Sequence, residues 1–185
     1  MIEVDDCHTE LLASLVKCHK PVNVLELGIG TGKTSRAIIS ALEWNEQDYN
    51  YNLVDSGIDW NGPDKIPYEN IEHLKEKKAT LFVADELTFV MHTKETYDFI
   101  FSDADHYNTD KWFDYVFTRL LNPGGILVYH DVANDVFPNL SNISKRAEEL
   151  GLHHVHFTKS SRKGEECERG LFVIFKPVLV STVRS

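Results

Sequence analysis

The chain has 185 residues, of which 42% are hydrophobic and 26% charged, and its net charge is −10 at pH 7. These values suit a single globular domain over residues 1–185, and the acidic charge excludes a broad nucleic-acid-binding face. No stretch is apolar over the length of a membrane span, and the start of the chain lacks a signal-peptide pattern. We therefore expect a cytoplasmic protein that binds neither nucleic acid nor membrane.

The first predicted element is a helix over residues 6–20, whose leucines recur at helical spacing. Cys7 and Cys18 lie on its apolar face and are expected to pack into the core. Together with Cys167 they make an odd number of cysteines without the spacing of a metal site, so we expect free thiols in a reducing compartment. The tail at residues 177–185 is expected to be loosely held.

A short strand, a glycine turn and a helix follow. Residues 22–27 are apolar and predict a buried strand, glycines alternate over residues 28–32, and residues 34–43 have helical spacing. This arrangement brings backbone N–H groups and a helix N-terminus to a ligand.

Several motifs compete for the glycine turn. A phosphate-binding Walker A loop requires a glycine where Leu27 stands, although residues 32–34 match the end of that motif. A dinucleotide fingerprint requires a third glycine where Lys33 stands. The third pattern, an acid followed by three alternating glycines, spans Glu26 to Gly32 without a mismatch. A structural turn that binds nothing is the remaining possibility.

Hydrophobic periodicity predicts the other elements. Strands are expected at residues 51–54, 80–84, 97–101, 126–129, 153–158 and 171–176, and helices at residues 68–77, 86–93, 108–121 and 138–150. Strands that alternate with helices predict a doubly wound α/β sheet, whose ligands lie outside the carboxyl ends of the strands. The last two strands are expected to form a hairpin.

Acidic residues follow two of the early strands. Asp55, with Ser56 beside it, stands where βαβ nucleotide folds hold ribose hydroxyls, because a carboxylate accepts from two vicinal O–H groups. Asp85 and Glu86 follow the next strand, where an acid can accept from an adenine amino group. The alternatives are a turn residue at Asp55 and a helix N-cap at Asp85.

A second group of titratable residues follows the fourth and fifth strands. Asp103, His130 and Asp131 offer oxygen and nitrogen donors for one divalent ion. Carboxylates suit Mg²⁺, Ca²⁺ or Mn²⁺, and an imidazole ligand favours Mn²⁺, Fe²⁺ or Zn²⁺. His106 lies close by in the sequence, and an imidazole suits a general base that removes a hydroxyl proton. A buried structural histidine is the competing interpretation of His130.

The glycine turn resembles the first motif of class I S-adenosylmethionine-dependent methyltransferases, and a carboxylate at Glu26 suits the positive charge of that ligand. Residues 97–107 and 121–131 are similar to metal-dependent small-molecule O-methyltransferases of the catechol, caffeoyl-CoA and macrolide-sugar types. The resemblance covers residues 22–131. It implies a Rossmann-like, seven-stranded sheet with an antiparallel last strand and helices on both faces.

The resemblance also implies roles for single residues. Asp103 and the pair His130-Asp131 would hold the metal, and His106 would be the catalytic base. The relatives carry Asp-Asn or Glu-Asp at that pair, so His130 either ligates as an imidazole, changes the preferred metal or marks its loss. The residues implied to bind S-adenosylmethionine are Glu26, Gly28, Gly30, Thr31, Gly32, Asp55, Ser56, Asp85, Glu86 and Asp103.

We therefore expect an enzyme that transfers a methyl group from S-adenosylmethionine to a hydroxyl of a small molecule, a sugar or diol, with the help of Mg²⁺ or Mn²⁺. The alternatives are a metal-independent methyltransferase of nitrogen or of proteins, a non-catalytic module that binds S-adenosylmethionine, and a P-loop nucleotide hydrolase. Residues 56–67, residues 159–170 or a second subunit of a homo-oligomer are expected to supply a substrate lid.

Overall fold

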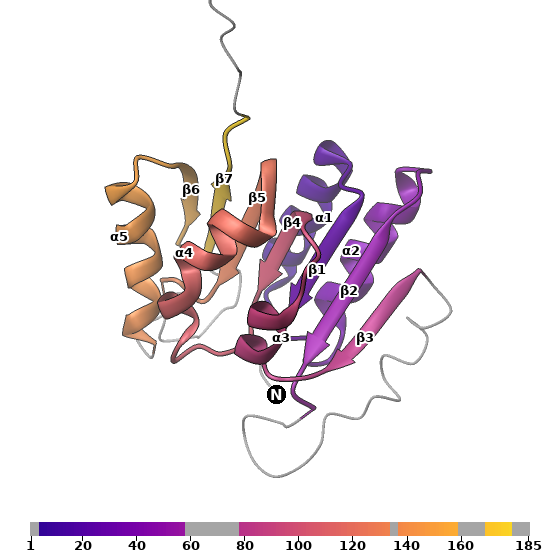
Figure 1. The fold of residues 1–185 in the computed structure, drawn as a ribbon. Helices are drawn as coiled ribbons and strands as arrows, with labels where there is room; N and C mark the ends of the chain where they lie inside the picture. Colours follow the sequence, from indigo (N-terminus) through magenta and orange to yellow (C-terminus); the bar gives the residue numbers. More distant parts are fainter. Residues whose placement is uncertain (1–3, 58–77, 134–136, 159–168, 179–185) are drawn as a thin grey trace, which may run out of the picture.

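The computed structural model describes residues 4–57, 78–133, 137–158 and 169–178. Seven strands form one sheet in the order β3-β2-β1-β4-β5-β7-β6 (Figure 1). Strands β1 to β5 pair in parallel, and β7 is antiparallel to both of its neighbours. The predicted sheet with an antiparallel last strand is therefore confirmed. The strands are β1 Asn23–Leu27, β2 Asn50–Asp55, β3 Ala79–Val83, β4 Tyr97–Ser102, β5 Leu121–His130, β6 His153–Phe157 and β7 Leu171–Phe175.

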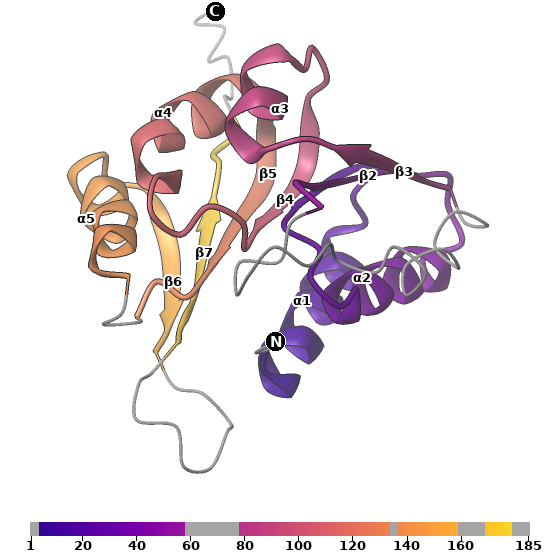
Figure 2. The same ribbon diagram turned by 90° about the horizontal axis from the view of Figure 1, so that it is seen from below.

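Helices cover both faces of the sheet. The first two, α1 and α2, lie on one face, and α3, α4 and α5 lie on the other (Figures 1 and 2). Within the described ranges, no helix is both long and apolar enough to cross a bilayer. The helices are α1 Asp6–His19, α2 Lys33–Trp44, α3 Glu86–His92, α4 Phe113–Tyr115 and α5 Ser141–Glu149, with the shorter η2 Thr109–Trp112, η3 Val116–Leu120 and η4 Pro138–Leu140.

The central strands are buried on both sides because each face of the sheet has its own apolar cluster. In β1, Val24 and Leu25 are both fully buried but belong to different clusters. Leu12 of α1 and Ile38 of α2 share the cluster of Val24, whereas Val116 shares that of Leu25. Covering both faces explains why the central strands read as continuous apolar runs rather than as alternating ones.

The helix predicted over residues 108–121 is less regular than expected. It consists of the 3₁₀ turn η2, the short α4 and the π-helical η3, and β5 begins at Leu121 rather than at residue 126. The Lys176 ammonium donates to the carbonyls of Phe117 at 2.7 Å and Leu121 at 2.6 Å. This side chain satisfies carbonyl groups that a helix C-terminus leaves without intrahelical partners, so the end of the segment is held by the residue that follows β7.

Helix α1 confirms the predicted N-terminal helix but turns a different face inward. Its buried residues are His8, Thr9, Leu12 and Val16. Cys7 and Cys18 are free thiols but exposed, so the prediction that they pack into the core is wrong. The buried His8 and Thr9 make polar contacts inside the molecule, and this orientation of the helix places the two cysteines on its outer side.

Four sequence-based predictions lie wholly or mostly outside the described residues. They are the helix at residues 68–77, the thiol of Cys167, most of each predicted lid loop and most of the loosely held tail at residues 177–185.

Candidate active site

The glycine turn after β1 lies directly against the loop after β4. Gly28, Gly30 and Gly32 all have positive φ, at 86°, 54° and 75°. A Cβ atom added to Gly28 would lie 2.4 Å from the carbonyl oxygen of Asp103, and the Asp103 amide donates to Leu27 at 2.8 Å. Only glycine fits this backbone at Gly28, so the turn and the acidic loop are held together.

Asp55 lies beneath the glycine turn and binds its backbone. One carboxylate oxygen accepts from the amides of Ile29 at 2.8 Å and Gly30 at 3.4 Å, and the other accepts from Gly57 at 2.8 Å. A carboxylate has about four acceptor positions, so one position is left for a ligand hydroxyl. The ribose role of Asp55 stays a prediction. Thr31 is partly exposed in the turn, and Ser56 is exposed beside Asp55.

Glu26 is fully buried between β1, β2 and α2. It accepts hydrogen bonds from Ser35 at 3.0 Å and from the Tyr51 hydroxyl. Burial raises the pKa of Glu26 to about 8, although the bonds from Tyr51 and Ser35 favour the ionised form. Near neutral pH the side chain is therefore mainly protonated in this environment, and a direct electrostatic role toward a sulfonium stays a prediction.

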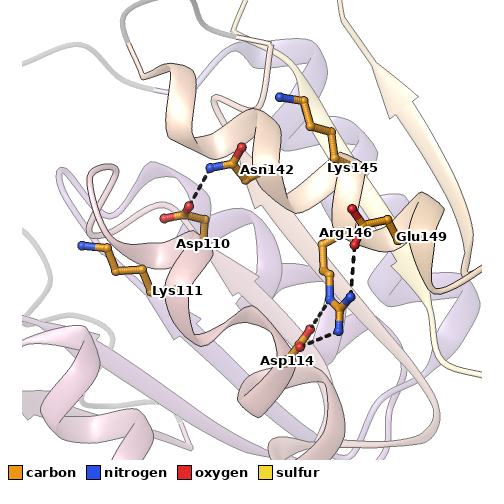
Figure 3. Close-up of a pocket in the computed structure, with 7 residues that line it drawn as sticks. All are labelled: Asp110, Lys111, Asp114, Asn142, Lys145, Arg146 and Glu149. Carbon is orange, nitrogen blue, oxygen red and sulfur yellow. Dashed lines mark hydrogen bonds and ion pairs between the residues drawn. The ribbon is translucent and has the colours of Figure 1, made fainter.

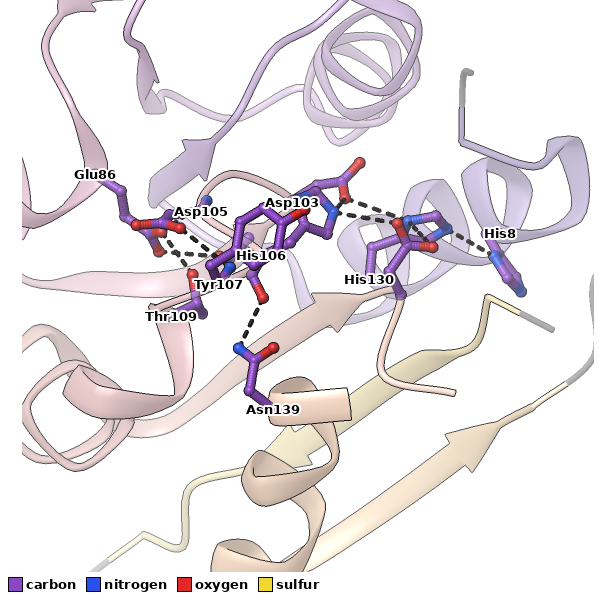
Figure 4. A network of polar contacts seen from close by, with 11 residues as sticks. His8, Glu86, Asp103, Asp105, His106, Tyr107, Thr109, His130 and Asn139 are labelled. Atoms are coloured by element: carbon purple, nitrogen blue, oxygen red, sulfur yellow. Dashed lines mark hydrogen bonds and ion pairs between the residues drawn. The ribbon is translucent and has the colours of Figure 1, made fainter. Parts of the chain in front are cut away.

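Asp85 and Glu86 differ although they are adjacent. Asp85 is exposed and caps α3, accepting from the Thr88 amide at 2.9 Å, so its predicted N-cap role is confirmed. Glu86 is buried and accepts from the Asp105 amide at 3.1 Å and the Thr109 hydroxyl at 2.7 Å (Figure 4). Burial raises the pKa of Glu86. Its carboxylate thus organises the loop after β4, and its contact with a cofactor stays a prediction.

The four titratable residues predicted to converge do so at the ends of β4 and β5 (Figure 4). The Nε2 atom of His106 lies 3.1 Å from a carboxylate oxygen of Asp103 and 3.1 Å from one of Asp131. The Nδ1 atom of His130 lies 3.3 Å from Asp103 and 3.4 Å from Asp131. Two carboxylates and two imidazoles therefore share one edge of the sheet.

The two carboxylates set the charge of His106. Burial alone lowers the pKa of this imidazole, but the hydrogen bonds and charges of Asp103 and Asp131 outweigh burial and raise the pKa to about 10. Burial likewise favours neutral Asp103, yet the neighbouring His130 and His106 hold the pKa of Asp103 well below its usual range. In these contacts His106 is an imidazolium that donates to two carboxylates.

The same residues fit a divalent ion. Asp103, His130 and Asp131 each offer one ligand atom, and these atoms lie within 4.8 Å of one another. Among the described residues, His130 Nδ1 and one oxygen of Asp131 are buried without a hydrogen-bond partner. These two atoms contact each other only as an ion pair at 3.4 Å, and buried polar atoms nearly always have a hydrogen-bond partner, so the pair matches a cation site.

Two aromatic residues border this cluster. The ring of Phe137 lies 4.5 Å from that of His106, and Tyr107 packs edge-on against Phe137. Tyr107 is 69% exposed, so it presents an apolar surface to solvent beside the cluster. The Asn139 amide donates to the His106 carbonyl at 2.7 Å and holds this loop in place (Figure 4).

His8 and Asp5 are the residues that the sequence did not indicate. The Nδ1 atom of His8 lies 3.2 Å from His130 Nε2, although the two residues are 122 positions apart. No local motif marks such a pair, because the contact exists only once α1 has packed beside β5.

A surface groove of about 350 Å³ lies between η2, α4 and α5 and does not include the strand-end cluster (Figure 3). Arg146 pairs there with Asp114 and Glu149, at 2.9 Å and 3.1 Å. Asn142 donates to Asp110 at 2.9 Å. These groups already satisfy one another, so the groove has no chemistry comparable to that of the cluster.

A sequence profile described as a methyltransferase domain matches residues 25–132. This match covers more than half of the 185 residues and runs from β1 to just beyond the end of β5. The chain belongs to the methyltransferase-domain family. A comparison with curated proteins gave no match.

Solved structures share the fold of this methyltransferase-domain protein. An O-methyltransferase from Bacillus cereus in complex with SAH is 20% identical, with a TM-score of 0.71 over 94% of this chain and 83% of that one. The O-methyltransferase TomG from Streptomyces achromogenes, involved in tomaymycin synthesis and in complex with SAM, is 15% identical, with a TM-score of 0.71 over 94% and 82%. The SAH-bound methyltransferase PaMTH1 from Podospora anserina is 14% identical, with a TM-score of 0.67 over 93% and 79%.

Proposed function

We propose that the protein transfers a methyl group from S-adenosylmethionine to a hydroxyl group of a small molecule, with a sugar or vicinal diol favoured. The observation that carries this proposal is the contact between the glycine turn and the Asp103 loop, which puts a cofactor turn and an acid–imidazole cluster side by side. Ligands of open α/β sheets bind at this edge. The complexes of the Bacillus cereus and Streptomyces achromogenes proteins with SAH and SAM support the choice of cofactor.

The cofactor would lie along the carboxyl ends of β1, β2 and β3. We assign its methionyl end to the glycine turn, its ribose to Asp55 with Ser56, and its adenine to Asp85 with Glu86. S-adenosylmethionine supplies an electrophilic methyl group, whose C–S bond breaks as the C–O bond of a methyl ether forms and S-adenosylhomocysteine is left.

Asp103, Asp131 and His130 would hold the divalent ion, for which their donor atoms are suitably placed. An ion of the Mg²⁺ or Mn²⁺ type supplies a positive charge that lowers the pKa of an acceptor hydroxyl. The exposed Tyr107 beside Phe137 offers an apolar face for the carbon skeleton of the acceptor.

His106 would accept the hydroxyl proton at Nε2. This atom now donates to Asp103 and Asp131, and the high pKa keeps the ring protonated. A divalent ion on Asp103 and Asp131 would offset the charges that raise this pKa, so ion binding would change these contacts and make His106 available as a base. The bond from Asn139 to the His106 backbone keeps the residue at the cluster during that change.

Formation of S-adenosylhomocysteine tests the proposal. The protein is incubated with S-adenosylmethionine, Mg²⁺ or Mn²⁺, and a panel of sugars and diols, and the product is quantified by mass spectrometry. We expect turnover with at least one member, and a loss of about 10²- to 10⁴-fold in kcat for His106→Gln with unchanged affinity for S-adenosylmethionine. Affinity for S-adenosylmethionine without turnover on any hydroxylated acceptor would favour the non-catalytic module.

The direct contact of His106 with two carboxylates also favours a second candidate, a metal-independent methyltransferase. Turnover before and after treatment with EDTA distinguishes the two. We expect activity to disappear with EDTA and to return with added Mg²⁺ or Mn²⁺. Full activity in EDTA would show that the metal assignment is wrong and that His106 works with Asp103 and Asp131 alone.

A further inference from the structure

A second group of metal-binding side chains lies on the far side of His130 from Asp103. His8, in the first turn of α1, points its Nδ1 atom at His130 Nε2 across 3.2 Å (Figure 4). Asp5, the residue before α1, has a carboxylate oxygen 3.6 Å from the same His8 atom. One ligand atom from each of the three residues lies within 4.8 Å of the others. Neither His8 nor Asp5 has a role in the proposed methyl transfer.

The side chains of this group are buried, unlike the polar residues that usually begin a surface helix. Asp5 is 0% exposed, and His8 and His130 are each 2% exposed. Asp5 occupies the N-cap position of α1, where an Asp normally accepts from the next turn, but its side chain makes no capping bond. Its carboxylate instead lies near the His8 imidazole, inside the molecule.

The two separations around His8 Nδ1 match a tetrahedral zinc site. With zinc–nitrogen bonds of about 2.0–2.1 Å, two ligands at the tetrahedral angle are about 3.3 Å apart. The observed separations from His8 Nδ1 are 3.2 Å to His130 and 3.6 Å to Asp5. Two imidazoles and one carboxylate are ligands that favour Zn²⁺ over Mg²⁺, which prefers oxygen.

We propose that Asp5, His8 and His130 form a second, buried divalent-metal site that binds Zn²⁺ and joins the start of α1 to the end of β5. The three protein ligands leave a fourth tetrahedral position open. The site does not depend on the proposed methyl transfer, because it can be measured by metal binding alone.

His130 connects this site to the Asp103 cluster. Its Nε2 atom faces His8, whereas its Nδ1 atom lies 3.3 Å from Asp103. With zinc on Nε2, the Nδ1–H group points at a carboxylate, which is the arrangement that orients many zinc-bound histidines. The oxygens of Asp103 and Asp131 then remain for a hard cation such as Mg²⁺. With zinc bound, His130 would therefore support the cation site of Asp103 and Asp131 by donating to Asp103 rather than as a ligand.

Zinc affinity tests the proposal. The metal-free full-length protein is titrated with Zn²⁺ against a chromophoric chelator, and with Co²⁺ while the visible spectrum is recorded. We expect tight binding of zinc and the intense Co²⁺ bands of a tetrahedral site. His8→Ala should weaken zinc binding at least about tenfold and abolish these bands, whereas Asp103→Asn should lose affinity through the missing partner of His130 Nδ1 but retain the bands at saturating Co²⁺. His19→Ala, at the other end of α1, is the matched control and should behave as the wild type.

Asp5→Asn provides a second variant that keeps the shape of the side chain. Asp5→Asn should lower zinc affinity at least about tenfold, as His8→Ala should. If circular dichroism shows that His8→Ala is misfolded, the zinc affinity of Asp5→Asn still tests the proposed site. Equal zinc affinity in wild type and Asp5→Asn would overturn the proposal. So would a loss of the Co²⁺ bands in Asp103→Asn alone.

Discussion

Gly28 lies where the loop after β4 leaves no space for a side chain. Its φ is 86°, and an added Cβ would lie 2.4 Å from the Asp103 carbonyl oxygen. Gly151 has a similar φ of 64°, but nothing lies within 4 Å of an added Cβ. Gly151→Ala therefore measures the backbone cost of about 1–2 kcal/mol, and Gly28→Ala should cost about 1–3 kcal/mol more in free energy of unfolding. Urea denaturation of both variants checks this, and equal costs would contradict the contact.

Glu26 should make stability depend on pH. Its pKa rises from 4.5 to about 8 on burial, so between these pH values the folded state holds a proton that the unfolded state has lost. The free energy of unfolding should then fall as pH rises through this window, by at most about 1.4 kcal/mol for each pH unit. Glu26→Gln removes this titration and should gain stability relative to wild type from pH 5 to 8, by roughly that slope. Urea denaturation measures both proteins, and a stability difference between Glu26→Gln and wild type that is the same at every pH would rule out titration of Glu26.

For single residues, the sequence predicted where the candidate site lies better than it predicted what surrounds each side chain. Asp103, His106, His130 and Asp131 could be assigned to one edge because each follows a recognisable strand. The protonated state of Glu26 could not be predicted, because it depends on complete burial by residues of other elements. His8 was missed for the same reason, since its partner is 122 residues away.

Lys176 holds the end of the segment that precedes β5. Its ammonium donates to the carbonyls of Phe117 and Leu121 and lies over the Phe117 ring at 5.4 Å. Hydrogen bonds to charged groups contribute about 1.5–3 kcal/mol each, so Lys176→Met should lower the free energy of unfolding by about 2 kcal/mol or more. Lys145, exposed on α5, is the matched control, and Lys145→Met should have little effect. Chemical denaturation of both variants compares them, and similar stabilities would argue against capping by Lys176.

Among the elements, those with a strong apolar period were predicted well and those shaped by distant side chains were not. The strand of residues 22–27 and the glycine turn were confirmed because both depend on local backbone preferences. The helix of residues 108–121 became a run of 3₁₀, α and π segments, and its end is bound by Lys176, more than fifty residues further along the chain. Local propensity carries no information on such a partner.

The arrangement of the whole molecule follows from alternating strands and helices. The strand order and the antiparallel β7 agree with the sequence-based prediction, and the fold is shared with structures that are only 14–20% identical. Packing of α1 beside β5 is what brings Asp5 and His8 to His130, at the sheet edge that also carries Asp103. The fold therefore adds a contact between distant segments that no single motif contains. Oligomeric state and cellular location stay predictions.

Binding of S-adenosylmethionine tests the central proposal most directly. In isothermal titration calorimetry of the full-length protein, we expect saturable binding of one ligand per chain. Asp55→Asn should weaken the binding at least about tenfold, as expected for loss of a charged hydrogen bond, whereas Asp48→Asn, on the surface, should not. No measurable binding at millimolar S-adenosylmethionine would contradict the proposed function.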